Sequence, residues 1–157
     1  MTNSFQFVAL PSKQFEPLFG MSDAELRAVN VRRMIADEKP GFPCRVSLAD
    51  AEVGEIVLLV PFKHHDVSSP YRASGPIIIR RGAGTATPAV NEIPVMFTHR
   101  LLSLRAYDAA AMLVGAEIIT GRELETAIRN FLANDTVNYL HIHNARPGCY
   151  NCRVVRA

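Results

Sequence analysis

Residues 120–155 read TGRELETAIRNFLANDTVNYLHIHNARPGCYNCRVV, a pattern that predicts one helix followed directly by two strands. Thr120 is a favourable helix cap, and Glu123 completes a capping box in which each side chain bonds the other residue's backbone N–H. An apolar stripe at helical spacing follows, made of Leu124, Ala127, Ile128, Phe131 and Leu132. We therefore expect a helix from Gly121 to about Ala133, with this stripe packed on a sheet.

Strands are expected on both sides of this helix. Beyond it, Val137 to His143 and Cys149 to Val155 alternate or run apolar, and residues 144–148 between them can reverse the chain. Before it, Leu101 to Asp108 alternates strictly, and Ala110 to Ile119 is a further apolar stretch. Glu55 to Phe62 is almost continuously apolar, which is typical of a strand buried on both faces.

Few helices and many strands, without regular alternation, favour an α+β fold. The strands follow one another like hairpins, so we expect a largely antiparallel sheet with two or three helices packed on it. A second capping box, Ser22 with Glu25, starts a short helix. No linker divides the 157 residues, so we expect a single domain over 1–157.

Composition excludes several classes of protein. The chain is 48% hydrophobic and 20% charged, as globular proteins are, and its net charge of +2 is too small to favour a nucleic-acid partner. The longest aliphatic run, Ile56 to Val60, is far too short to cross a membrane. Three cysteines form no secreted disulfide framework. We expect a soluble, cytoplasmic protein with neither nucleic-acid nor membrane partners.

Several phrases resemble a bacterial family catalogued as domain of unknown function 1203. They are Pro43-Cys44-Arg45-Val46-Ser47-Leu48, Pro70-Tyr71-Arg72-Ala73-Ser74-Gly75-Pro76-Ile77, Leu104-Arg105-Ala106-Tyr107-Asp108 and His141-Ile142-His143-Asn144-Ala145, with Gly148-Cys149 after them. The resemblance covers nearly the whole chain. It implies a small, stand-alone bacterial protein and no particular reaction.

Arginine and tyrosine residues in these phrases predict a pocket for a small anion. The candidate ligand-binding residues are Arg45, Tyr71, Arg72, Arg105 and Tyr107. Guanidinium groups suit bidentate capture of carboxylate or phosphate, and loops over a rigid sheet often carry function. The alternative is that the arginines form internal ion pairs with acidic residues, namely Asp37, Asp50, Glu55 or Asp108.

A metal site is a second hypothesis. His141 and His143 project from one face of their strand, and Cys149 and Cys152 follow shortly after. Two imidazoles and two thiolates would make a tetrahedral zinc set. The alternative is that the histidines are a hydrogen-bonded strand face and the cysteines pack in the core, so no cofactor is expected by default.

Catalysis would need a nucleophile with a base beside it. Cys44, followed by Arg45, is the candidate nucleophile, with His143 or His64 as the base, and Cys149 is a second option. A buried, unreactive cysteine is the alternative. His64 and His65 fall in a segment, Lys63 to Gly75, that we predict to be a polar loop exposed to solvent.

The first functional hypothesis is thus an uncharacterised protein that binds a small anionic molecule, with or without catalysis. A metal-binding module and a non-catalytic protein-interaction domain are the alternatives. The sequence does not decide whether the protein is an enzyme, which ligand it takes or how many copies assemble.

Overall fold

The long apolar strand forms the centre of a three-stranded antiparallel sheet in the computed structural model, which describes residues 3–157. This sheet has the order β2-β3-β4, with β2 at Arg32–Ile35, β3 at Ile56–His65 and β4 at Ala73–Arg80. Because β3 lies between two partners, both of its edges are hydrogen-bonded. A continuous apolar run suits that position.

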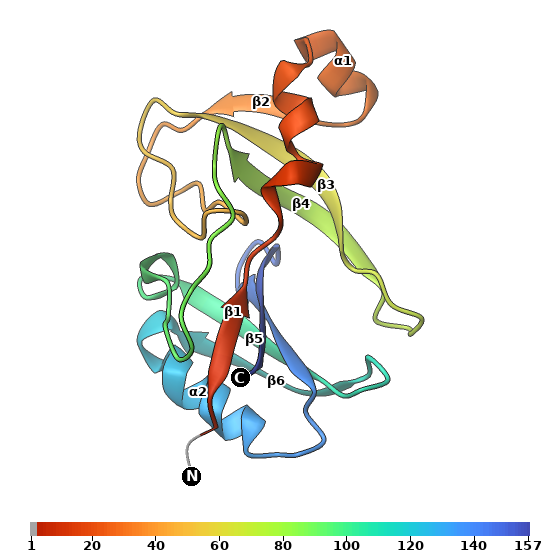
Figure 1. Cartoon of the computed structure of the whole chain (residues 1–157), viewed down its shortest axis with the longest axis vertical. Coiled ribbons are helices and arrows are strands. Elements are labelled where there is room, and N and C mark those ends of the chain that lie inside the picture. The colour runs from red at the N-terminus through yellow and green to blue at the C-terminus, as the bar shows by residue number, and fades with distance from the viewer. Residues whose placement is uncertain (1–2) are drawn as a thin grey trace.

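The remaining strands form a second, five-stranded antiparallel sheet with the order β1-β8-β7-β5-β6. Its strands are β1 (Phe5–Val8), β5 (Leu101–Tyr107), β6 (Leu113–Thr120), β7 (Tyr139–Asn144) and β8 (Tyr150–Arg156). Figure 1 shows the three-stranded sheet in the upper half of the molecule and the five-stranded sheet in the lower half. The expected antiparallel α+β fold is confirmed, with the strands divided between two sheets.

Two α-helices accompany the sheets. α1 spans Asp23–Ala28 and α2 spans Leu124–Leu132, and both predicted capping boxes are present, at Ser22 and at Thr120. The first turn predicted for the long helix is a short 3-10 segment, η4 (Gly121–Glu123), so α2 begins later than expected. The other 3-10 segments are η1 (Ser12–Gln14), η2 (Glu16–Gly20) and η3 (Val95–Phe97). No helix among residues 3–157 is long and apolar enough to cross a membrane.

The five-stranded sheet has two faces of different character. On one face α2 buries Leu124, Ile128 and Leu132 against Leu102 and Leu104 of β5, in the largest hydrophobic core of the molecule. The other face carries polar rings and guanidinium groups and meets the end of β3 from the three-stranded sheet. β6 is an edge strand, and its Val114 and Ile118 are 43% and 69% exposed.

The predicted loop from Lys63 to Gly75 is wrong at both ends. β3 continues through His64 and His65, and β4 already begins at Ala73, which pairs with His65. The ends of the β3–β4 and β5–β6 hairpins lie on the same side of the molecule in Figure 1, where the Ser69 hydroxyl donates a hydrogen bond of 2.8 Å to the Ala111 carbonyl. The two sheets are therefore tied together at their hairpin ends.

Candidate functional site

The polar face of the five-stranded sheet is set by strand register. Arg105 on β5 lies opposite His141 on β7, and His141 lies opposite Arg153 on β8. Tyr107 lies opposite Tyr139 in the same way. Since side chains alternate between the faces of a strand, these residues share the face that α2 does not cover.

The end of β3 adds two imidazoles from the other sheet. The ring of His65 lies 4.8 Å from the ring of His141 and 4.3 Å from that of Tyr107, between centroids. The ring of His64 lies 5.1 Å from His143 and stacks on Tyr150 at 5.1 Å and 12°. The two sheets thus enclose one ring cluster, which consists of His64, His65, Tyr71, Tyr107, Tyr139, His141, His143 and Tyr150.

Hydrogen bonding fixes the tautomer of neutral His65. Its Nδ1 lies 2.8 Å from the carbonyl oxygen of Tyr71, which can only accept, so Nδ1–H donates. Its Nε2 is then the acceptor for the Tyr139 hydroxyl, 2.6 Å away. His65, at 3% exposure, is therefore a fully bonded link between the sheets and not the exposed loop residue that the sequence suggested.

Three other ring nitrogens are buried without a hydrogen-bond partner among the described residues. They are Nδ1 of His64, Nδ1 of His141 and Nε2 of His143. Neutral His143 donates from Nδ1 to the Gly148 carbonyl at 2.9 Å, so its Nε2 carries a lone pair. Buried polar atoms are nearly always bonded, so an unbonded one needs an explanation, and a role at a functional site is one. These nitrogens mark the ring cluster as the candidate site.

Burial keeps three histidines of this cluster, His64, His141 and His143, uncharged near neutral pH. Burial is the largest influence on all three histidines, and it lowers the pKa of His64 and of His143 to about 4 and that of His141 to about 2. His65 and Arg105 lower the pKa of His64 further. Burial also raises the pKa of Tyr107 and Tyr139, so their hydroxyls stay protonated and can donate.

A pocket of about 410 Å³ opens beside the ring cluster, between β1, β3, β7 and β8. Part of its lining is apolar, from Val8, Ala9, Leu10, Pro11, Phe62 and Val67. The rest is polar, from His64, His65, Asp66, Tyr139, His141, Tyr150 and Arg153. The guanidinium of Arg153 lies 4.7 Å above the centre of the Tyr139 ring. Such a mixed lining suits a small molecule with one apolar and one charged end.

Besides His64 and His141, which line the pocket, four further predicted site residues lie in or against the ring cluster. Tyr71, Tyr107 and His143 belong to it, with Tyr71 and Tyr107 rings 6.1 Å apart, and Arg105 acts electrostatically on His64, His143 and Tyr107. They are not part of the pocket lining described above. The structure therefore brings them together behind the pocket, while Arg153 lies at it.

The other predicted residues lie elsewhere. Arg72 is exposed and forms an ion pair of 3.4 Å with Asp66. Arg45 is 1% exposed, and its Nε donates to the Tyr150 carbonyl at 2.7 Å while Nη2 contacts Cys149 Sγ at 3.3 Å. Cys44 is buried in the core, where its Sγ accepts from the backbone N–H groups of Ser47 and Arg80.

The predicted four-ligand metal set is not assembled. His141 and His143 lie on the polar face of the five-stranded sheet, whereas Cys152 packs in the core on the other face. Burial raises the pKa of the Cys152 thiol to about 12. Cys149 Sγ accepts from Arg45 and from the side-chain amide of Asn144. No group of three or more histidine, cysteine or acidic residues within 3–157 is placed to hold a metal ion.

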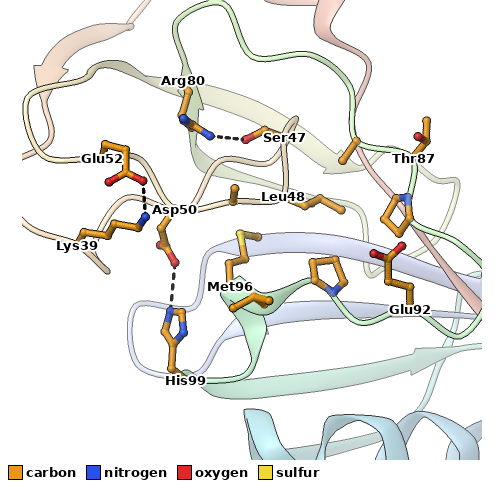
Figure 2. A pocket seen from close by; sticks show the side chains of 15 residues that line it. Lys39, Ser47, Leu48, Asp50, Glu52, Arg80, Thr87, Glu92, Met96 and His99 are labelled. Carbon is orange, nitrogen blue, oxygen red and sulfur yellow. Dashed lines mark hydrogen bonds and ion pairs between the residues drawn. The ribbon is translucent and has the colours of Figure 1, made fainter.

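A second pocket, of about 520 Å³, lies between Lys39, the Ser47–Glu52 segment and η3 (Figure 2). Most of its charged side chains are paired within the protein: Asp50 with His99 and Arg100, Lys39 with Glu52, and Arg80 with Glu55. Glu92 instead accepts a hydrogen bond from the backbone N–H of Ala89. Asp50 and Glu55 do form internal ion pairs, as the alternative hypothesis proposed, but with Arg100 and Arg80 in place of the predicted arginines. With these charges neutralised, this pocket is a weaker candidate.

Sequence reasoning singled out His64 and His141 among the residues that line the first pocket but missed others. Tyr139, Tyr150 and Arg153 were within the predicted C-terminal strands but were not singled out. The position of Tyr139 could have been predicted, because Tyr139, His141 and His143 alternate along one strand and so share one face. No sequence pattern indicated that His64 and His65 on β3 would join this face, since only the packing of one sheet on the other brings them close.

Comparison with known proteins gives one match. A family profile described as "Protein of unknown function (DUF1203)" matches residues 41–156. No curated protein and no solved structure matches the chain.

Proposed function

This chain belongs to the DUF1203 family, whose description assigns no activity, and we propose from the site that it binds a small organic anion in the pocket beside the ring cluster. The ligand would place its charged group near Arg153 and its apolar part against Phe62 and the Val8–Pro11 segment. The proposal concerns binding. A catalytic role for His143 or Cys44 stays a prediction from the sequence.

One observation carries the proposal: the guanidinium groups of Arg105 and Arg153 adjoin the ring cluster without a carboxylate partner. Within residues 3–157, neither of them forms an ion pair. Each acts electrostatically on a ring of the cluster, Arg105 on His143 and Arg153 on His141. Arg105 is half-buried and Arg153 is exposed at the pocket, and positive charge that no carboxylate offsets favours an anionic partner there.

The rest of the lining fits the same ligand class. A volume of about 410 Å³ suits a molecule of metabolite size. Asp66 is the acidic residue in the lining, and Arg72 already offsets its charge. Arg153 over the Tyr139 ring is held in a defined position, and a planar guanidinium can bind a carboxylate through two parallel hydrogen bonds.

Calorimetric titration with benzoate tests the proposal, with benzamide as a neutral molecule of the same shape. Benzoate should bind, and benzamide should bind at least about tenfold more weakly because it lacks the charge. Arg153→Met should weaken benzoate binding by about tenfold or more. Arg81→Met removes an exposed arginine away from this pocket and should leave binding unchanged. Equal affinity for benzoate and benzamide, or no effect of Arg153→Met, would contradict the proposal.

A further inference from the structure

The imidazole groups around the pocket have an unusual electrostatic setting. His64 lines the pocket, and besides burial its pKa is lowered by His65 on its own strand and by Arg105 on β5. His141 and His143 on β7 face it with ring centroids at 6.3 and 5.1 Å. A positive charge on His64 is therefore opposed by Arg105, and the two rings on β7 supply no negative charge to offset it.

The other neighbours of His64 do not offset this field. Tyr150 on β8 stacks on it as a neutral ring, since burial raises the tyrosine pKa. Arg153 on β8 lies at the same pocket and adds positive charge. Asp66, next but one to His64, also lines the pocket but forms an ion pair of 3.4 Å with Arg72. An anion in the pocket would thus be the main group able to offset charge on His64.

We propose that His64 takes up a proton when an anion enters this pocket, so that ligand and proton bind together. The inference rests on the proposed function and adds the form in which the ligand is held: an anion paired with a newly formed imidazolium. Of the cluster, His64 is the histidine best placed for this, because it lines the pocket and is half-buried, while His141 is buried more deeply.

Whether His64 is protonated in the complex depends on the charges close to its ring. In the free protein the pKa of His64 is lowered to about 4, so at neutral pH the ring carries no charge. One negative charge about 5 Å away raises the pKa of such a group by about 2 at the effective dielectric constant of a protein surface. His64 would then be largely protonated in the complex at about pH 5.5 and largely neutral without ligand.

The sign of the pH dependence follows from this difference. Because the complex binds more protons than the free protein, affinity rises as pH falls from the pKa of the complex toward that of the free protein. The affinity should change by up to about tenfold per pH unit between these values and be flat above them. An ordinary surface arginine site would show no such change over this range.

The test is calorimetric titration with benzenesulfonate, a ligand that stays ionised at all these pH values, so any proton taken up resides on the protein. At about pH 5.5, wild-type protein is titrated in two buffers with different ionisation enthalpies, and the difference in heat gives the number of protons bound. We expect about 0.5 to 1 proton per site. Binding with the same heat in both buffers, after correction for concentration, would overturn the inference and leave the proposed function standing.

Two variants test whether the proton taken up on binding resides on His64. His64→Gln should bind benzenesulfonate with no proton uptake and with affinity independent of pH. His99→Gln, at a half-exposed histidine of the other pocket, should keep the wild-type uptake. Uptake that persists in His64→Gln would overturn the assignment to His64. If neither benzoate nor benzenesulfonate binds the wild-type protein, the proposed function fails and this inference with it.

Discussion

The Tyr139 hydroxyl donates a hydrogen bond of 2.6 Å to Nε2 of His65, and this bond crosses from the five-stranded to the three-stranded sheet. Both residues line the candidate pocket. The same contact therefore holds the sheets together and sets the shape of the site. The ring cluster is thus part of the fold as well as of the candidate site.

Removal of the Tyr139 hydroxyl should lower the stability of the protein measurably. Tyr139→Phe leaves the buried Nε2 of His65 without a donor, and we expect the free energy of unfolding to fall by about 1 to 2 kcal/mol. Urea denaturation measures this. Tyr71→Phe is the matched control, because Tyr71 is half-exposed and contacts His65 through its backbone carbonyl. Equal losses in the two variants would mean that the bond between the sheets contributes nothing specific.

Stability should depend on pH through the buried histidines. The pKa of His141 is lowered to about 2 and that of His143 to about 4, while both return to about 6.5 on unfolding. The unfolded chain then binds more protons, so stability is full above about pH 6.5 and falls as pH decreases toward 4.

Each of these histidines should change the free energy of unfolding by up to about 1.4 kcal/mol per pH unit between about pH 6.5 and 5. This range lies above the ordinary pKa of carboxylates. Urea midpoints across this range test the expectation, and His141→Gln should lower the slope. Stability that is constant between about pH 7 and 5 would show that the cluster takes up protons without unfolding.

Arg45 should be a structural residue. Arg45→Met removes the buried donors to the Tyr150 and Pro43 carbonyls, and we expect a loss of about 2 to 4 kcal/mol in the free energy of unfolding. Arg105→Met, at a half-buried position on the polar face, should cost less than about 1 kcal/mol and weaken benzoate binding. The opposite pattern, a stable Arg45→Met that no longer binds, would restore the role that the sequence suggested for Arg45.

The three cysteines should differ in accessibility. Cys44 and Cys152 are buried, whereas Cys149 is half-buried. Iodoacetamide at neutral pH should therefore modify Cys149 in the folded protein, and the other two only after denaturation. Peptide mass spectrometry reads each site separately. Equal modification of Cys152 in the folded state would be incompatible with its place in the core.

Gly121 in η4 should tolerate no side chain, because the backbone of Phe97 lies too close to it. A Cβ at this position would lie 1.9 Å from the backbone oxygen of Phe97, and the Gly121 N–H is bonded to the Arg100 carbonyl at 2.8 Å. Gly121→Ala should lower stability by about 2 kcal/mol or more, because the backbone must move. Gly84→Ala meets nothing within 4 Å and is the control, expected to be nearly neutral in thermal denaturation.

Much of the fold followed from local patterns. The capping boxes at Ser22 and Thr120, the alternating strand from Leu101 and the hairpin at the C-terminal strands were all predictable, because each depends on residues near in sequence. The division into two sheets was not predictable in this way. It depends on which strands pair across large separations, and β5 pairs with β7 as well as with β6.

The site was predicted only in part, for a physical reason. Polarity ended the expected strand at Phe62, yet β3 runs on through His65, because its polar rings are buried against the opposite sheet and not in water. Arg45 and Arg105 look alike in the sequence. They differ because the backbone of Tyr150 encloses Arg45. Which rings converge is a property of packing between sheets, which local patterns do not encode.

The open edge at β6 also limits how the protein should be handled. Its free backbone groups and the exposed Val114 and Ile118 form a strand that can add to another sheet, which is a common route to aggregation. Glu117, exposed between them, is the charge that interrupts this strand. Its replacement by an apolar residue would favour precipitation in concentrated solution before any loss of folding.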